Sequence, residues 1–141
     1  MTRFFSLVAL LAVAAIPGAA SAGQLTLRIH DIPAGGGRLM IAVVASEAAF
    51  DGDEPGIASF MLPASSASVE LTTSALPDGH YAVRVMHDAN GNGELDSNMV
   101  GIPTEAWGFS NDASGSFGPP SWDDAHFELG GETTQDIHLN H

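Results

Sequence analysis

From residue 24 onward the chain consists of short stretches in which apolar and polar side chains alternate. In the first of them, Leu25, Leu27 and Ile29 are separated by polar residues. Successive side chains of a β-strand point to opposite faces of a sheet, so this period of two indicates a strand with one buried face. Seven strands are predicted in this way: Gln24–His30, Arg38–Ala45, Ile57–Leu62, Ser68–Thr73, His80–His87, Ala125–Leu129 and Thr134–Leu139.

Turn-forming residues separate the predicted strands, and no segment has convincing helical periodicity. The clearest turn is Leu76–Gly79, where Pro77 fixes one backbone angle and Asp78-Gly79 tolerates the next. Short strands joined by turns predict an all-β fold in which two sheets enclose one core. We therefore expect an antiparallel β-sandwich of about seven strands, immunoglobulin-like or transthyretin-like, with a small β-barrel as the alternative.

The first 22 residues have the pattern of a secretory signal peptide. Arg3 precedes an apolar run over residues 4–16, and Ala20-Ser21-Ala22 has the small residues of a cleavage site. The apolar run is too short to span a bilayer comfortably. We expect cleavage after Ala22, export to the periplasm or the medium, and a single β-sandwich domain over residues 23–141.

The composition disfavours several classes of partner. The chain has 17 acidic residues, 4 basic residues and a formal net charge of −13. Such a surface repels phosphate backbones and anionic membranes, so we expect neither nucleic acid nor a membrane as a partner. The chain also has no cysteine, so an exported domain of this sequence has to be stabilised by its apolar core or by a bound metal rather than by disulfides.

The segment Asp88–Asp96, with the sequence DANGNGELD, is the strongest indication of chemistry in the chain. Oxygen-bearing side chains recur at alternate positions, and Gly93 follows the third of them. Calcium loops have this spacing, because the hard cation needs several oxygen ligands and the chain has to turn sharply around it. We predict a calcium site with these candidate ligands: Asp88, Asn90, Asn92, Glu94 through its backbone carbonyl, Asp96 and Glu105.

This loop is an incomplete match to an EF-hand. Its twelfth position is Met99, where an EF-hand has a bidentate glutamate, and the flanking segments are not predicted helices. Either Asn98 or Glu105 would have to supply the missing oxygen. The alternative is that the segment forms only turns, because asparagine and glycine tolerate positive φ and Asp88 and Asp96 can cap such turns.

The predicted loop of about residues 88–124 is unusually long. Loops longer than about 12–15 residues without structure of their own are usually functional or disordered. The aromatic residues Trp107, Phe109 and Trp122 argue against disorder. They either form a private core of the loop or an aromatic surface. As an alternative to calcium binding, this surface would bind a glycan or a protein partner without a metal.

Histidine and methionine give only weak indications of a transition-metal site. The six histidines are scattered along the chain, and no pair has the spacing of ligands on a helix. The soft ligands, Met61, Met86 and Met99 among them, show no cluster in the sequence. We therefore expect no transition-metal site.

A hydrolase is a remote alternative. It would need Ser110 or Ser121 as a nucleophile beside a base such as His126. No nucleophile-elbow pattern surrounds either serine. We therefore expect a non-enzymatic module.

The predicted strand order groups residues at the two ends of the sandwich. If successive strands alternate in direction, the turn after the first strand, the loop after the fifth strand and the C-terminus lie at one end. Asp31, the loop that begins at Asp88, His138 and His141 are then expected together. The acidic segment of residues 51–54 is expected at the opposite end.

Several motifs resemble those of one bacterial protein family. They are His87–Asp96, Gly101-Ile102-Pro103-x-Glu105-x-x-Gly108-Phe109-Ser110-Asn111, and Leu76-Pro77-Asp78-Gly79-His80-Tyr81-Ala82. Together with the signal peptide and the C-terminal pair of strands, they resemble an uncharacterised family, the domain of unknown function numbered 2141, over nearly the whole mature chain. The resemblance implies an exported β-sandwich and brings no established activity.

Overall fold

The computed structural model describes residues 21–141, so the predicted signal peptide lies outside the described residues up to position 20. The expected cleavage point falls one residue inside the first strand, which begins at Ala22. The elements of the described part are β1 (Ala22–His30), β2 (Arg38–Val44), α1 (Glu47–Asp51), β3 (Ala58–Pro63), β4 (Val69–Thr72), β5 (Leu76–Pro77), β6 (Gly79–Asp88), β7 (Trp107–Phe109), the 3₁₀-helix η1 (Ser110–Asp112), α2 (Trp122–Ala125), β8 (Phe127–Leu129) and β9 (Glu132–His138).

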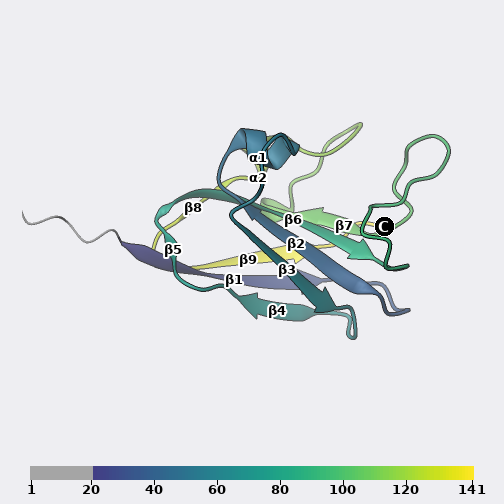
Figure 1. The fold of residues 1–141 in the computed structure, drawn as a ribbon, viewed down its shortest axis with the longest axis horizontal. Helices are drawn as coiled ribbons and strands as arrows, with labels where there is room; N and C mark the ends of the chain where they lie inside the picture. Colours follow the sequence, from purple (N-terminus) through teal and green to yellow (C-terminus); the bar gives the residue numbers. More distant parts are fainter. Residues whose placement is uncertain (1–20) are drawn as a thin grey trace, which may run out of the picture.

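The strands form two sheets that stack as separate layers (Figure 1). In the four-stranded sheet, β1 pairs antiparallel with β4 and β5 and in parallel with β9. The five-stranded sheet has the antiparallel order β3-β2-β6-β7, and β8 also pairs with β6. The predicted β-sandwich is confirmed, and the barrel alternative is not. The parallel pairing of β1 with β9 departs from the expected fully antiparallel arrangement.

The core lies between the inner faces of the two sheets. The alternating residues Leu25, Leu27 and Ile29 of β1 are fully buried, as are Leu39 and Val43 of β2. They belong to one cluster that continues through β6, β8 and β9. Full burial of each such side chain contributes about 1.5–3 kcal/mol, so the alternation read from the sequence is also the main source of stability.

Two one-turn helices cover part of the outer face of the five-stranded sheet. The Ser46 side chain accepts a hydrogen bond from Ala49 N (3.1 Å) and begins α1, and Ser121 does the same for α2 through Asp124 N (3.2 Å). Helices this short have no periodicity to detect, so the sequence indicates them only through their capping serines. Their contacts form a second apolar cluster: Val44, Ala49, Phe50, Ala82, Ala113 and Ala125, with Phe109 and Trp122 packed against it.

The segment expected as one long loop is divided by β7. This strand pairs with Arg84–Met86 of β6 and separates residues 89–106 from residues 113–121. We call these two stretches the first and second lobe. Figure 1 shows them as two loops that project separately from the sandwich. The outer face of the five-stranded sheet between the lobes and β3 is not covered by either helix.

The ends of the strands group as the predicted order requires. The turn after β1 lies against the end of β6, because His87 Nε2 is 2.7 Å from Gly36 O. The C-terminal residues lie at the same end, where Leu139 N donates to His30 O (3.1 Å). Helix α1 follows β2 at the opposite end. No helix within residues 21–141 combines the length and the apolar character needed to cross a membrane.

Candidate functional site

Asp88 holds the first lobe in place from a fully buried position at the end of β6. Its Oδ1 accepts hydrogen bonds from Gly91 N (2.9 Å) and Asn92 N (3.1 Å). Its Oδ2 accepts from Gly93 N (2.9 Å) and from Arg38 Nε (2.8 Å). Burial raises the pKa of the Asp88 carboxyl, but the hydrogen bonds from Arg38 and the loop amides outweigh it, so the pKa lies below its ordinary value.

The other predicted calcium ligands bond to one another within the lobe. Asn90 Nδ2 donates to Asp96 Oδ2 (2.6 Å), and Asn92 Nδ2 donates to Asp96 Oδ1 (2.9 Å). The two asparagine oxygens accept from backbone amides two residues further on, at Asn92 and Glu94. These are the side-chain-to-backbone bonds of Asx turns. The Glu94 side chain is exposed.

Glu105 closes the first lobe from its other end. Its Oε1 accepts from Ala89 N (2.9 Å), and its Oε2 accepts from Asp96 N (3.0 Å). The side chain therefore joins the beginning of the lobe to its middle while being buried itself. Glu105 is a candidate ligand of this loop in the sequence, and the structure places it there as an acceptor for two backbone amides.

In this arrangement the predicted calcium ligands already take part in hydrogen bonds. A carboxylate has about four lone-pair positions, and all four of Asp88 receive hydrogen bonds, one of them from a guanidinium. The amide nitrogens of Asn90 and Asn92, rather than their oxygens, face Asp96. Within residues 21–141 no group of three or more His, Cys, Asp or Glu side chains is arranged to hold a metal. Calcium binding stays a prediction, and it requires these bonds to rearrange.

The three aromatic residues predicted to bind a ligand separate into two places. Trp107 and Phe109 lie on β7, with ring centroids 5.7 Å apart in an edge-to-face arrangement, and both line cavities. Trp122 instead stacks on His126 at 5.2 Å and meets Phe50 edge-on, within the second apolar cluster. Trp107 and Phe109 therefore line the candidate surface, whereas Trp122 is partly buried against that cluster and lines neither cavity.

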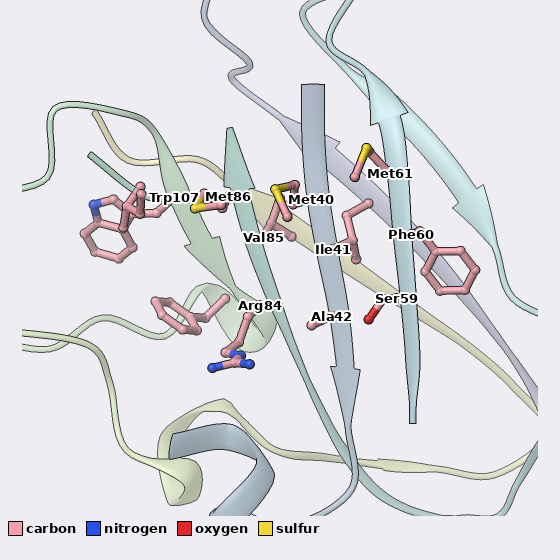
Figure 2. A pocket seen from close by; sticks show the side chains of 12 residues that line it. Met40, Ile41, Ala42, Ser59, Phe60, Met61, Arg84, Val85, Met86 and Trp107 are labelled. Carbon is pink, nitrogen blue, oxygen red and sulfur yellow. The ribbon is translucent and has the colours of Figure 1, made fainter. Parts of the chain in front are cut away.

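A cavity of about 510 Å³ opens on the uncovered outer face of the five-stranded sheet, and we call it the sheet cavity. Figure 2 shows the labelled side chains that line it, which come from β3, β2, β6 and β7, while Leu95 belongs to the first lobe. The residues that line it are Met40, Ile41, Ala42, Ser59, Phe60, Met61, Arg84, Val85, Met86, Leu95, Trp107 and Phe109.

A second cavity, of about 640 Å³, lies between the two lobes, and we call it the lobe cavity. It shares Leu95, Trp107 and Phe109 with the sheet cavity, so the two adjoin at β7. Together they form what we call the apolar cleft. Large apolar side chains of the lobes are exposed in or beside it: Met99, Val100, Ile102 and Phe117.

The serines considered for catalysis have structural roles. Buried Ser110 donates to Ala125 O (2.6 Å) and accepts from Val83 N (2.9 Å). Ser121 caps α2 and donates to Asp124 Oδ2 (2.8 Å). His126 Nδ1 lies 2.9 Å from Trp122 O. The hydrogen bonds of these groups therefore hold the fold together, and none of them joins a serine to a histidine.

Sequence reasoning missed a histidine pair at the end of the four-stranded sheet. His30 and His138 stack with ring centroids 4.7 Å apart, because parallel pairing of β1 and β9 sets them side by side. His30 Nε2 lies 2.8 Å from Asp136 Oδ1, and His138 Nδ1 lies 2.9 Å from Asp112 Oδ2. Only the register of a parallel strand pair, which the sequence does not display, brings them together.

Comparison with known protein families gives a match over most of the chain. The family described as "Uncharacterized protein conserved in bacteria (DUF2141)" matches residues 27–138, which is nearly the whole described domain. Among curated proteins and among solved structures no match to the chain is found. The match agrees with the resemblance seen in the motifs, and its description names no ligand or reaction.

Proposed function

From the premise that this chain belongs to the family of uncharacterised bacterial proteins DUF2141, we propose that it is an exported, non-enzymatic binding module whose ligand surface is the apolar cleft. The family name supplies no activity, so the support comes from the surface itself. Export rests on the signal-peptide pattern of residues 1–22.

The observation that carries the proposal is the exposure of large apolar side chains around the cleft. Met61, Met99, Val100, Ile102 and Phe117 are each more than half exposed. Exposed apolar side chains that gather around one groove mark an interaction site more often than singly scattered ones do. The second apolar cluster shows that the same sheet face is covered where helices reach it. The uncovered part is therefore the part available to a ligand.

The chemistry of the lining favours a protein partner over a glycan. Sugar recognition needs polar groups placed around an aromatic ring. The described lining offers few, and the guanidinium of Arg84 already donates to Phe50 O (3.0 Å). Methionine, tryptophan and phenylalanine are enriched at protein interfaces. The net charge of −13 favours a basic partner. We therefore assign the cleft to a partner segment with apolar side chains flanked by basic residues.

Tryptophan fluorescence tests this assignment directly. The Trp122→Phe variant leaves Trp107, in the cleft, as the only tryptophan. Addition of an amphipathic leucine–lysine peptide is expected to shift its emission to shorter wavelength, because the partner excludes water from the indole. A serine–lysine peptide of the same charge and a chitooligosaccharide are expected to leave the emission unchanged.

Matched variants distinguish specific binding at the cleft from nonspecific hydrophobic binding elsewhere on the surface. Phe109→Ala removes a ring shared by both cavities and should weaken peptide binding. Ile57→Ala removes an exposed apolar side chain that lines neither cavity, so this variant should bind the peptide as the parent does. Equal binding by Phe109→Ala and the parent protein would contradict the proposal. A response to the oligosaccharide but not to the leucine–lysine peptide would indicate that the ligand is a glycan and not a protein.

A further inference from the structure

The five-stranded sheet brings together three methionines that are far apart in the sequence. On its outer face Met40 of β2 is directly opposite both Met61 of β3 and Met86 of β6. Met86 is in turn opposite Trp107 of β7. Figure 2 shows these side chains on the same side of the sheet, around the sheet cavity that all four line. We call this set the methionine row. The expectation that the methionines form no cluster is wrong for these three.

We propose that the methionine row binds Cu(I) through the thioether sulfurs of Met40, Met61 and Met86. Thioethers are soft ligands that select Cu(I) over harder cations. Directly opposed residues of neighbouring strands have Cβ atoms about 4.5–5.5 Å apart. The two outer methionines can therefore lean toward a cation above Met40, since each side chain has three rotatable bonds.

The surroundings of the methionine row suit a soft cation. Of the described residues that line the sheet cavity, none is an aspartate, glutamate or histidine, so calcium or zinc would lack its preferred ligands there. The indole of Trp107 flanks the row, and a cation near its face gains cation–π attraction. The acidic chain as a whole attracts cations.

Two arginines are close enough to compete, and both are bound elsewhere. Arg38 Nη1 lies 3.4 Å from Met61 Sδ, while its Nε and Nη2 donate to Asp88 Oδ2 (2.8 Å) and Gly91 O (3.0 Å). Arg38 can therefore release the sulfur and keep its other two hydrogen bonds. Arg84 donates to Phe50 O, toward α1. Met61, which is the most exposed of the three, is the ligand whose contact with Arg38 has to break.

Methyl NMR of the whole chain, labelled with ¹³C at the methionine methyl groups, tests the proposal. Ag(I), added as silver nitrate in chloride-free buffer, is a probe with the same softness and no redox chemistry. One equivalent is expected to shift the methyl signals of Met40, Met61 and Met86 and to leave Met99, in the first lobe, in place. Competition with a chromogenic Cu(I) chelator under anaerobic conditions then measures Cu(I) affinity.

Leucine variants provide the control, because a leucine for a methionine nearly conserves volume. The triple variant Met40→Leu, Met61→Leu and Met86→Leu is expected to bind Cu(I) more than about tenfold more weakly, because loss of even an outer-shell partner of a metal ligand costs about 10–100-fold in affinity. Met99→Leu is expected to bind like the parent. Circular dichroism confirms that each variant is folded.

Three results would overturn the site: no methyl shift at one equivalent of Ag(I), an equal shift of Met99, or undiminished Cu(I) binding by the folded triple variant. The test is independent of the proposed partner binding. Phe109→Ala keeps all three sulfurs, so it is expected to bind Ag(I) like the parent while its affinity for the leucine–lysine peptide falls.

Discussion

The hydroxyl of Ser110 shows how single polar side chains join distant parts of this domain. It is fully buried, accepts a hydrogen bond from Val83 N of β6 and donates one to Ala125 O of α2. It therefore ties the central strand of the five-stranded sheet to the segment that follows the second lobe. A residue that looks from the sequence like a candidate nucleophile is thus a structural link.

We predict that Ser110→Ala lowers the free energy of unfolding by about 1–3 kcal/mol. The substitution leaves the buried amide of Val83 without a partner, and an unsatisfied buried donor costs about this much. Urea denaturation followed by circular dichroism measures the change. Ser74→Ala, at an exposed position, is the control and should stay within about 0.5 kcal/mol of the parent. A similar small effect for Ser110→Ala would refute the structural role.

His138 is expected to titrate above the ordinary range for histidine. Its hydrogen bond to Asp112 raises its pKa most, burial opposes this, and the charges of Asp112, Asp31 and Asp136 raise the pKa further. Because the pKa of His138 is raised in the folded state, protonated His138 contributes its full stabilisation at pH values below its unfolded-state pKa. It is lost as the pH rises through the folded-state pKa. Proton NMR titration of the imidazole measures this value.

The Asp112→Asn variant identifies the cause of that shift. It removes the charge that bonds His138 Nδ1 while keeping a side chain of the same shape. We expect the pKa of His138 to fall in this variant. An unchanged value would show that the Asp112 contact does not control the titration.

At the scale of elements, local patterns predicted most strands but not the role of the first lobe. The period of two is a property of each segment, so β1, β2 and β6 could be identified from residues such as Leu25, Leu39 and Val83. The oxygen spacing from Asp88 to Asp96 was also visible. The sequence does not reveal that hydrogen bonds already occupy the oxygens of Asp88, because one of these bonds comes from Arg38, 50 positions away in the chain.

If the hydrogen bonds of the first lobe hold, millimolar calcium leaves the melting temperature of the chain unchanged, whereas the predicted calcium loop would raise it. The carboxylate of Asp88 is saturated by hydrogen bonds, so a cation would have to displace bonds that already order the lobe. A ligand stabilises a protein only if it binds the native state. Differential scanning calorimetry with calcium chloride and with magnesium chloride is the measurement. A rise in melting temperature that is specific to calcium and is lost in Asp96→Asn would establish the calcium loop.

At the scale of the whole molecule, the functional candidates arise from strand register. The sandwich was predictable because alternating apolar residues have to face a common core. The methionine row, the histidine pair and the apolar cleft were not predictable. Each consists of residues on different strands, and only the pairing of β1 with β9 and of β2 with β3 and β6 makes them neighbours. Strand β7, at three residues, is too short to recognise, yet it places Trp107 and Phe109 at the centre of the cleft.

The most direct measurement of the central claim is a map of amide shifts in ¹⁵N-labelled protein titrated with the leucine–lysine peptide. If the apolar cleft is the ligand surface, the largest shifts will fall on β7 and on the two lobes, at Leu95, Ile102, Trp107, Phe109 and Phe117. The amides of β4, in the other sheet, should be unaffected. Shifts that are absent from β7, or that are spread evenly over both sheets, would contradict it.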